Sequence, residues 1–397
     1  MKKYCAFKLS DLSKVFKSGL SVTLGVLATL ISSSVYANTS VLDNDLLRFG
    51  NGTAPSINNF GNLKQPFYYS PSNITWYKLT HGDKDLDMAI GIDGDGASDW
   101  NTNGVINENP TLTNQTVDVS NFTLVSGNKG YGTLVNTGDI TISGKALRIE
   151  TTYNLQNNKS FIGITTKVIN LSGGVINNLR VWVGTRDDYV GSDDGPTKIR
   201  GNIAAGAFAQ NAAKTDRASA LKITSDNADN SVAFFYSTSN KANIAVSGCC
   251  NFSNAINQNP DATDISINGD GSYAMYIRMD DLADNESEQF TWYYAAAEAG
   301  TIDSVIQDVA SASAVSKDIN EDTHLTFSSN DFKDSDNNII SKIKITSLPD
   351  AAKGKLQINN TDLQPNQEVL SSEYSNLTYI PVANFNGVDS FLWQGFI

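Results

Sequence analysis

Aspartate and asparagine alternate with small residues in one stretch of the chain, DGDGASDWNTNG, which covers residues 93–104. Asp93, Asp95 and Asp99 could present several oxygens to one ion, and Ca²⁺ takes about six to eight oxygen ligands. The spacing after Asp99 matches the first positions of an EF-hand loop, but Pro110 stands where that loop requires glutamate, so an EF-hand is excluded. A looser calcium site and an ion-free turn both remain open.

A second group of acidic residues lies between residue 317 and the end of the sequence. It could hold Ca²⁺ if the strands of a small domain bring its carboxylates together, and it could equally be a solvated acidic loop. Its members are Glu321, Asp322, Asp331, Asp334, Asp336 and Asp389.

Several spaced motifs occur in order in the same segment. They are Asn-Glu-Asp-Thr at 320–323, Leu-Pro at 348–349 with Gly-Lys-Leu at 354–356, Tyr-Ile-Pro at 379–381, and Phe-Asn-Gly-Val-Asp-Ser-Phe at 385–391. With these motifs the segment resembles the cadherin-like, Ig-like tandem repeats of large bacterial surface proteins, often grouped with VCBS repeats. The resemblance implies a β-sandwich module that uses Ca²⁺ and serves in adhesion.

The end of the sequence departs from that family, which usually continues its last strand with a further alternating run. Here the sequence stops at Phe396 and Ile397. Because an unfinished strand leaves an open sheet edge, we expect a fragment of a longer repeat protein in preference to an incomplete last strand.

Two pairs of adjacent aspartates could act as acid and base in hydrolysis of a glycosidic bond: Asp187 with Asp188, and Asp193 with Asp194. Acidic loops at sheet edges are much commoner than catalytic pairs, so the solvated loop is the favoured interpretation. The pattern therefore gives catalysis little support.

Histidine chemistry is restricted to His81 and His324, since the chain has two histidines. The sequence contains no G-x-S-x-G, H-E-x-x-H or Gly-rich phosphate loop. A sugar-converting enzyme would need a base opposite a carboxylate, and the candidate pairs are His81 with Asp83 and Tyr189 with Asp187.

Aromatic residues could form a platform on which sugar rings stack, although burial in the core is their commoner role. Both interpretations remain open for Trp76, Tyr77, Trp100, Trp182, Trp292, Tyr293 and Tyr294.

The best-patterned stretch, residues 145–188, positions the acidic loop. It predicts three consecutive strands, KALRIETTYNL, SFIGITTKVINL and INNLRVWVG, with turn-forming residues between them. In the first strand, apolar and polar residues alternate from Leu147 to Leu155, which places one set toward a core. We expect a meander that brings the carboxylates of 187–194 to one sheet edge.

Short strands separated by turns recur along the chain and predict an all-β fold. We expect a large antiparallel β-sandwich over 38–312, with a supersandwich as one form of it, followed by a smaller Ig-like β-sandwich over 313–397. Apolar residues at helical spacing predict one helix over 302–312, and 310–316 resembles a linker. Loops are expected at 93–110 and 201–217.

The first 37 residues have the pattern of a signal peptide. Five lysines precede the apolar run LSVTLGVLATLI at 20–31, and Val35-Tyr36-Ala37 fits a cleavage site, so we expect cleavage after Ala37. Loss of these five lysines and one aspartate takes the net charge from −13 to −17. Such acidity disfavours nucleic acid as a partner, because phosphate binding needs a basic face. We expect a secreted or surface-exposed protein with no transmembrane span after cleavage.

Cleavage would leave two adjacent cysteines, Cys249 and Cys250. In an oxidising compartment they could form a vicinal disulfide that stiffens a loop, and two free or intermolecular thiols are the alternative.

Together these features favour a secreted or cell-surface bacterial protein that binds or adheres, stabilised by Ca²⁺, with an extracellular glycan or surface ligand as partner. One alternative is a carbohydrate-active enzyme, since supersandwiches occur in sugar mutarotases and polysaccharide lyases. The other is a structural spacer without a ligand. The absence of catalytic motifs makes an enzyme the less favoured class.

Overall fold

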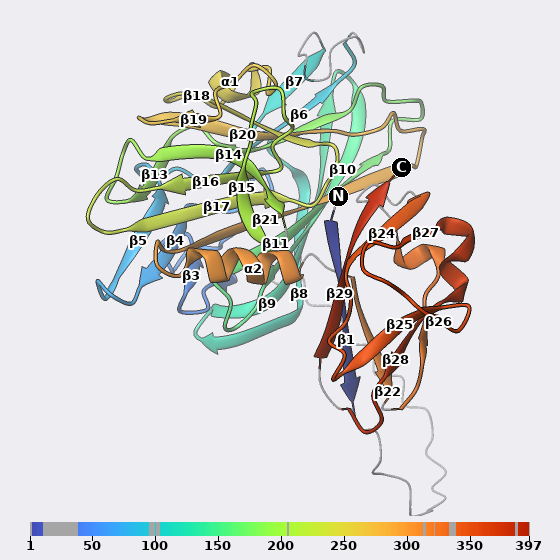
Figure 1. Cartoon of the computed structure of the whole chain (residues 1–397). Helices are drawn as coiled ribbons and strands as arrows, with labels where there is room; N and C mark the ends of the chain where they lie inside the picture. The colour runs from blue at the N-terminus through green and yellow to red at the C-terminus, as the bar shows by residue number, and fades with distance from the viewer. Residues whose placement is uncertain are drawn as a thin grey trace, which may run out of the picture. The chain divides into compact units, whose positions relative to one another are not determined.

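The computed structural model describes residues 2–10, 39–94, 100, 104–204, 206–312, 315–320, 322–332, 339–385 and 388–396. The chain divides into two compact units. The sandwich unit comprises Tyr36–Ala312, and the terminal unit comprises Ser313–Ile397 with Met1–Val35. Figure 1 labels their helices and strands.

The sandwich unit is built around one large sheet of eleven strands. Their order is β15-β14-β16-β17-β21-β11-β10-β9-β2, with β19 paired to β14 and β8 to β9. The bounds are β2 Val41–Leu42, β8 Thr113–Ser126, β9 Lys129–Ile142, β10 Lys145–Leu155, β11 Phe161–Asn170, β14 Thr197–Ala204, β15 Ala207–Gln210, β16 Ala220–Thr224, β17 Ser231–Ser237, β19 Ser266–Ile267 and β21 Ser287–Glu298.

Two smaller sheets complete this unit. The β12 sheet has the order β18-β20-β12-β6-β7, and the β5 sheet has the order β13-β5-β4-β3. The bounds are β3 Leu47–Phe49, β4 Pro66–Ser70, β5 Thr75–Thr80, β6 Asp87–Ile92, β7 Val105–Glu108, β12 Arg180–Thr185, β13 Asp188–Gly191, β18 Ala242–Gly248 and β20 Gly271–Arg278.

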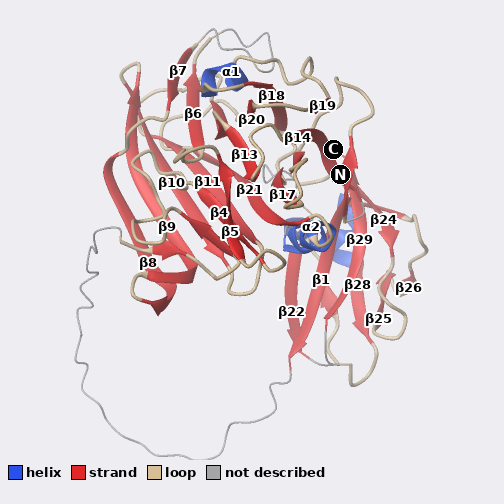
Figure 2. Cartoon of the chain, turned by 90° about the vertical axis from the view of Figure 1, so that its left-hand side faces the viewer, coloured by secondary structure: helices blue, strands red, loops and turns tan. Residues whose placement is uncertain are grey.

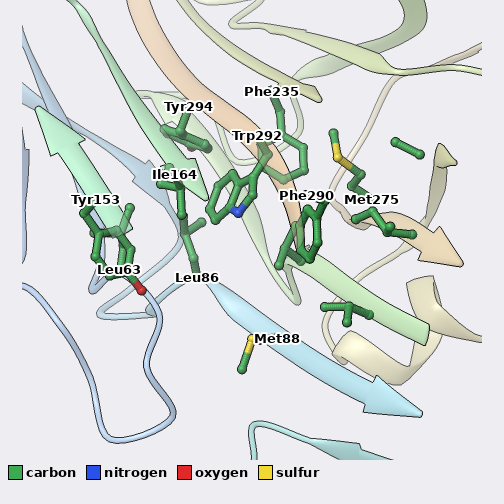
Figure 3. Close-up of a cluster of buried hydrophobic side chains, with 14 of the residues drawn as sticks. Leu63, Leu86, Met88, Tyr153, Ile164, Phe235, Met275, Phe290, Trp292 and Tyr294 are labelled. Atoms are coloured by element: carbon green, nitrogen blue, oxygen red, sulfur yellow. The ribbon is translucent and has the colours of Figure 1, made fainter. Parts of the chain in front are cut away.

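The main core of the sandwich unit joins side chains of all three sheets. The predicted alternation in β10 is confirmed, since Leu147, Ile149, Thr151, Tyr153 and Leu155 are all buried. Figure 3 shows part of this core, where Trp292 of β21 lies against Phe235 of β17 with ring centroids 5.2 Å apart. The predicted all-β sandwich is therefore correct, and Figure 2 shows how little of the described chain is helical.

The expected three-stranded meander is wrong in its third strand. β10 and β11 pair as predicted, but the other neighbour of β11 is β21, while β12 lies between β20 and β6. Val181 and Val183 point into the core from this opposite layer, and further chain covers the outward-facing Arg180 and Trp182. All six residues of β12 are buried, so an alternating pattern did not reveal which sheet holds the strand.

Among the described residues of the sandwich unit, two helices pack on its outer faces. α2, Ile302–Ala312, has the predicted bounds and buries Ile302, Ile306 and Val309 in a cluster with residues of the large sheet. α1, Phe252–Ile256, was not predicted, and it buries Phe252 and Ile256 in a cluster with outward-facing residues of the β12 sheet. The expected loops at 93–110 and 201–217 also contain the short strands β7 and β15.

The terminal unit has two sheets, with the orders β22-β1-β29-β24-β27 and β23-β28-β25-β26. Between them lies a core that includes Phe332, Tyr374 and Trp393. The bounds are β1 Lys2–Ser10, β22 Val315–Asn320, β23 Leu325–Thr326, β24 Lys342–Ser347, β25 Gly354–Ile358, β26 Thr361–Asp362, β27 Glu368–Leu370, β28 Leu377–Pro381 and β29 Val388–Phe396, with short 3₁₀ turns at Ser329–Asp331 and Ser371–Asn376. A second, smaller β-sandwich is thus present, and its resemblance to cadherin-like repeats remains an expectation.

Strand β1 falls within the predicted signal peptide, where no strand was expected. It pairs in parallel with β22 and antiparallel with β29. This is the arrangement of the 397-residue chain, so cleavage after Ala37 remains a prediction. The apolar run at 20–31 lies outside the described residues. Within the described ranges, no helix is long and apolar enough to cross a membrane.

Candidate functional site

A cavity of about 670 Å³ lies at one end of the β12 sheet. Segments that are distant in sequence surround it, including the ends of β18 and β20 and the stretch after α1. Its lining is aromatic and charged, and consists of Trp100, Thr215, Arg217, Lys241, Asn243, Asn259, Pro260, Asp261, Tyr276, Arg278, Met279, Asp280 and Asp281.

The aromatic part of this pocket follows from the pleat of β20. Met275 and Ile277 point into the main core, so Tyr276 between them points to the outer face of the sheet. There its ring lies 5.4 Å from that of Trp182, and Trp100 packs against the same cluster. Tyr276 and Trp100 both line the pocket, and the buried Trp182 packs behind them.

Hydrogen bonds fix the polar wall. The side chain of Asn243 donates to Asp261 at 2.8 Å and accepts from the main-chain N–H of Ala218 at 2.9 Å. The buried Arg200 donates to the carbonyl of Thr263 at 3.0 Å, and burial lowers the pKa of its guanidinium. These bonds hold the loop after α1 against β18 and β14, so the pocket is largely formed before a ligand arrives.

The positively and negatively charged residues that line the pocket are equal in number. Its cations are Arg217, Lys241 and Arg278, and its carboxylates are Asp261, Asp280 and Asp281. Lys241 forms ion pairs of 2.8 Å with both Asp280 and Glu288, while Arg217 donates to the carbonyl of Ser239 at 3.0 Å. A pocket of this kind offers hydrogen-bond donors and acceptors without a net attraction for phosphate or another strong anion.

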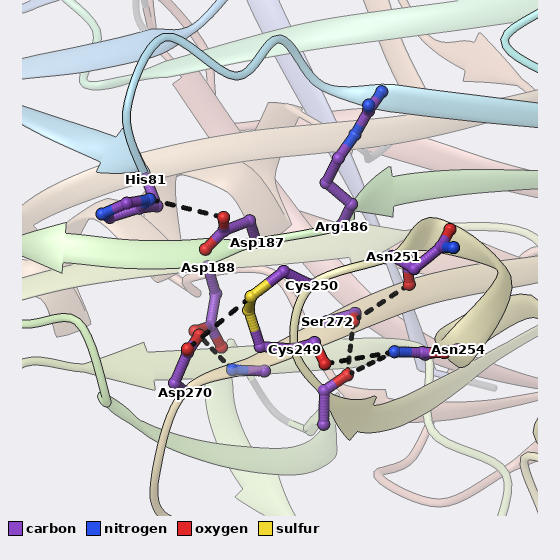
Figure 4. Close-up of a disulfide and its surroundings, with 12 residues drawn as sticks. His81, Arg186, Asp187, Asp188, Cys249, Cys250, Asn251, Asn254, Asp270 and Ser272 are labelled. Atoms are coloured by element: carbon purple, nitrogen blue, oxygen red, sulfur yellow. Dashed lines mark hydrogen bonds and ion pairs between the residues drawn. A yellow bond between two sulfur atoms is a disulfide. The ribbon is translucent and has the colours of Figure 1, made fainter.

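A second cluster, the His81 cluster, lies at the opposite end of the β12 sheet, where β12 ends and β20 begins. Figure 4 shows two of its members, His81 and Asp187, side by side. The cluster comprises His81, Asp187 and Asp194, each of which places one metal-binding atom within 4.8 Å of the others. His81 Nδ1 is 3.4 Å from Asp187 Oδ2, and its Nε2 is 3.7 Å from Asp194 Oδ1. The side chain of Asp187 is 7% exposed, against 44% for His81 and 59% for Asp194.

Asp270 and the bonded cysteines border this cluster. Burial raises the pKa of Asp270, and the negative charges of Asp187 and Asp194 raise it further. The structure joins Cys249 to Cys250 by a disulfide, and the sulfur of Cys250 lies 3.7 Å from Asp270 Oδ2.

The structure corrects the predicted pairings for catalysis. Among the described residues, His81 forms ion pairs with Asp187 and Asp194, not with its sequence neighbour Asp83. The ring of Tyr189 lies beside that of His81 at 5.8 Å and below Lys78 at 4.0 Å. The proposed pairing of Tyr189 with Asp187 is replaced by a histidine between two carboxylates.

The two members of each aspartate pair have different partners in the structure. Asp188 is buried and forms an ion pair of 2.5 Å with the buried Lys198, although burial raises the pKa of Asp188 to about 7. Asp193 accepts main-chain N–H groups of Gly195 at 2.9 Å and Asp226 at 2.6 Å, which gives it a role in loop structure. Asp187 and Asp194 therefore face His81, while their sequence neighbours stabilise the fold.

Of the three aspartates in the first expected calcium loop, only Asp93 lies among the described residues, whereas Asp95 and Asp99 lie outside them. Asp93 forms an ion pair of 2.8 Å with Lys145, and its carbonyl accepts from Arg180 at 2.9 Å. Asp93 thus fixes the end of β6, and calcium binding at this loop remains a prediction.

The second expected calcium group is likewise only partly described. Glu321, Asp334 and Asp336 lie outside the described residues. Asp322 accepts from the main-chain N–H of Asn384 at 2.8 Å, and the buried Asp389 accepts from the hydroxyl of Tyr379 at 2.8 Å. The remaining described member, Asp331, forms an ion pair of 2.7 Å with Lys317.

The aromatic residues divide between the two open interpretations. Trp182, Trp292, Tyr293 and Tyr294 are at most 7% exposed, so the core role is confirmed for them. Trp76 and Tyr77 lie on β5 and are half-buried, with the guanidinium of Arg48 4.3 Å above the ring of Trp76. Trp100 alone of that set lines the pocket.

Comparisons with known proteins give a fold likeness only. No family model matches the chain, and no curated protein matches it. A galactose mutarotase-like protein from Clostridium acetobutylicum is 10% identical, with a TM-score of 0.33 over 64% of this chain and 92% of that one. A polysaccharide lyase is 11% identical, with a TM-score of 0.37 over 89% and 46%. A bacterial glucoamylase complexed with acarbose is 10% identical, with a TM-score of 0.41 over 78% and 40%. Because these TM-scores lie below 0.5, no assignment of function follows from them.

Proposed function

We propose that the sandwich unit binds a neutral oligosaccharide in the pocket lined by Trp100 and Tyr276. The observation that carries this proposal is the combination of an aromatic surface with a charge-balanced polar wall in a cavity of about 670 Å³. Ligand pockets in proteins typically measure about 300–1,000 Å³ and place a few polar groups around an apolar surface.

The chemistry of a sugar matches both parts of the lining. The C–H face of a pyranose ring is apolar and can stack on an indole, as apolar groups do on aromatic rings. Its hydroxyls both donate and accept hydrogen bonds, so they can donate to the carboxylate of Asp261 and accept from the guanidinium groups of Arg217 and Arg278. Hydrogen bonds to charged groups are the stronger ones and are directional.

Alternative ligands fit less well. A nucleotide or nucleic acid would require an excess of cations, whereas the lining has as many carboxylates as cations and the chain carries a net charge of −13. A lipid would require a more apolar lining. We further propose, on the basis of the predicted leader, that the glycan is extracellular. The adhesive role expected from the repeat-like segment would then use this pocket for recognition.

Screening the full chain on an array of defined oligosaccharides, followed by titration calorimetry with the best ligand, tests the proposal. Stacking on Trp100 buries about 60 Å² of apolar surface, which at about 25 cal/mol per Å² contributes about 1.5 kcal/mol. Trp100→Ala is therefore expected to weaken binding about tenfold.

Trp76→Ala is the matched control, because Trp76 is also partly exposed but lies on β5 and does not line the pocket. It is expected to leave the dissociation constant unchanged. The absence of any array ligand, or equal effects of the two substitutions, would contradict the proposal.

A further inference from the structure

We propose that the His81 cluster binds one divalent transition-metal ion of the Zn²⁺ class through His81, Asp187 and Asp194. One possible ligand atom from each of these residues lies within 4.8 Å of the others, with His81 after β5 and the two aspartates on either side of β13. Figure 4 shows His81 and Asp187 facing each other. This site is distinct from the oligosaccharide pocket, and the inference does not depend on the proposed function.

The distances suit such an ion. Zn²⁺ binds histidine nitrogen and carboxylate oxygen at about 2.0–2.2 Å, so two ligands of a tetrahedral site lie about 3.4 Å apart. His81 Nδ1 and Asp187 Oδ2 are 3.4 Å apart. One donor atom from each of the three residues lies within 4.8 Å of the others. Because His81 now faces Asp187 with Nδ1 and Asp194 with Nε2, one of the two carboxylates must turn toward the nitrogen that binds the ion.

A second observation points independently to a ligand. The side chain of Asp187 is 7% exposed, its Oδ2 atom faces His81, and its Oδ1 atom has no hydrogen-bond partner. The nearby buried carboxylates of Asp87 and Asp188 each have a cationic partner, Arg186 and Lys198 respectively. A buried carboxylate oxygen without a partner is costly, and a bound cation would satisfy it.

The charges around the His81 cluster also favour a bound cation. Asp270 shares a possible ligand group with Asp187 but not with His81, so its carboxylate adds negative charge beside the cluster. His81 is charged only when it is protonated, and Figure 4 shows Arg186 pointing away from the cluster. A divalent cation would offset the repulsion among these carboxylates.

The donor types select the class of metal. Cys249 and Cys250 are joined in a disulfide, so they offer no thiolate to a soft metal. An imidazole nitrogen with carboxylates suits Zn²⁺, Mn²⁺, Co²⁺ or Ni²⁺, whereas Ca²⁺ takes oxygen ligands alone. Three protein ligands, two of them well exposed, leave room for water on the ion.

Titration calorimetry of the full chain with ZnCl₂, without any sugar, tests this site. The wild-type chain is expected to bind one Zn²⁺ in the sandwich unit. His81→Ala and Asp194→Asn, which both alter partly exposed side chains, are expected to weaken that binding at least about tenfold, while His324→Ala leaves it unchanged. His324 is the matched control, because it is the other histidine of the chain and lies in the terminal unit.

A spectroscopic reading separates direct ligation from an effect on folding. Because the chain has two histidines, the imidazole ¹⁵N signals of His81 can be assigned by comparison with His81→Ala, and Zn²⁺ is expected to shift them and not those of His324. The inference is overturned if Zn²⁺ does not bind, if His81→Ala binds it as tightly as the wild type, or if Ca²⁺ displaces Zn²⁺ at equal concentration.

Discussion

Replacing Arg186 by methionine is predicted to destabilise the sandwich unit by about 3–5 kcal/mol, because it leaves a charged carboxylate buried without its cation. Asp87 on β6 is fully buried, and the guanidinium of Arg186 donates to it from Nε at 3.0 Å and also from Nη2. The main-chain N–H of Arg186 and the side chain of Asn109 also donate to Asp87, each at 2.7 Å. The substitution removes the guanidinium bonds and keeps the other two.

Thermal unfolding followed by circular dichroism at pH 7 measures the effect. In a unit of this size, about 1 kcal/mol shifts the Tm by about 2–4 °C, so Arg186→Met is expected to lower it by about 6–20 °C. Lys145→Met is the matched control, because its partner Asp93 is 38% exposed and such ion pairs contribute at most about 1 kcal/mol.

A second substitution distinguishes the buried charge from lost packing. Adding Asp87→Asn to Arg186→Met removes the carboxylate charge, so the double variant is expected to be more stable than Arg186→Met alone. The reasoning is refuted if Arg186→Met costs no more than Lys145→Met, or if the double variant is the less stable one.

Three further predictions concern other parts of the chain. Burial raises the pKa of Asp229, but hydrogen bonds donated by Ser192 and Ser231 outweigh this effect and hold the pKa below its usual value. The stability that results is present above about pH 4 and is lost as the pH falls through the pKa that Asp229 has in the folded state. Asp229→Asn is therefore expected to cost about 1–3 kcal/mol in urea unfolding at pH 7 and less at pH 3, and an equal cost at both would contradict this. Ile306→Ala, at a fully buried site of α2, is expected to cost about 2–5 kcal/mol in the same assay, while the exposed Ser304→Ala costs under about 0.5 kcal/mol; similar costs would show that α2 does not stabilise the unit. If the acidic loops of the terminal unit bind Ca²⁺ as the sequence predicts, a Ca²⁺ concentration about 100-fold above Kd adds about 2.7 kcal/mol to its stability, and an unchanged Tm after chelation would exclude such a site.

Local patterns predicted the elements that have one polar and one buried face. In β10 the alternation from Leu147 to Leu155 matches the burial residue by residue, because one face meets the core and the other does not. In α2 the spacing of Ile302, Ile306 and Val309 matches a single buried stripe. In elements of this kind, the spacing of apolar residues shows which face is buried.

The place of β12 could not be predicted in the same way. Its six residues are buried on both faces, so their pattern does not show which layer holds them. The sequence left open whether Trp182 is exposed or buried, and in the structure it packs in a cluster with residues of α1 and with Trp100. Which strands pair depends on contacts between distant segments, and these leave no local signal.

The candidate sites were predicted only in part, for a related reason. The sequence indicated Trp100, but Arg217, Asn243 and Tyr276 were missed because the pocket draws single residues from several distant segments. The alternation in the predicted strand around Tyr276 could have placed its ring on the outer face. The sequence likewise named His81 and the acidic loop, but their meeting depends on β13 pairing with β5.

The location of a bound sugar tests the central claim most directly. A crystal structure of the sandwich unit or the full chain with the best oligosaccharide from the array should show a sugar ring stacked on Trp100. It should also show hydroxyls within hydrogen-bond distance of Asp261 or Arg278. A sugar bound at another surface, such as that of Trp76 on β5, with the pocket occupied by solvent alone, would contradict the account.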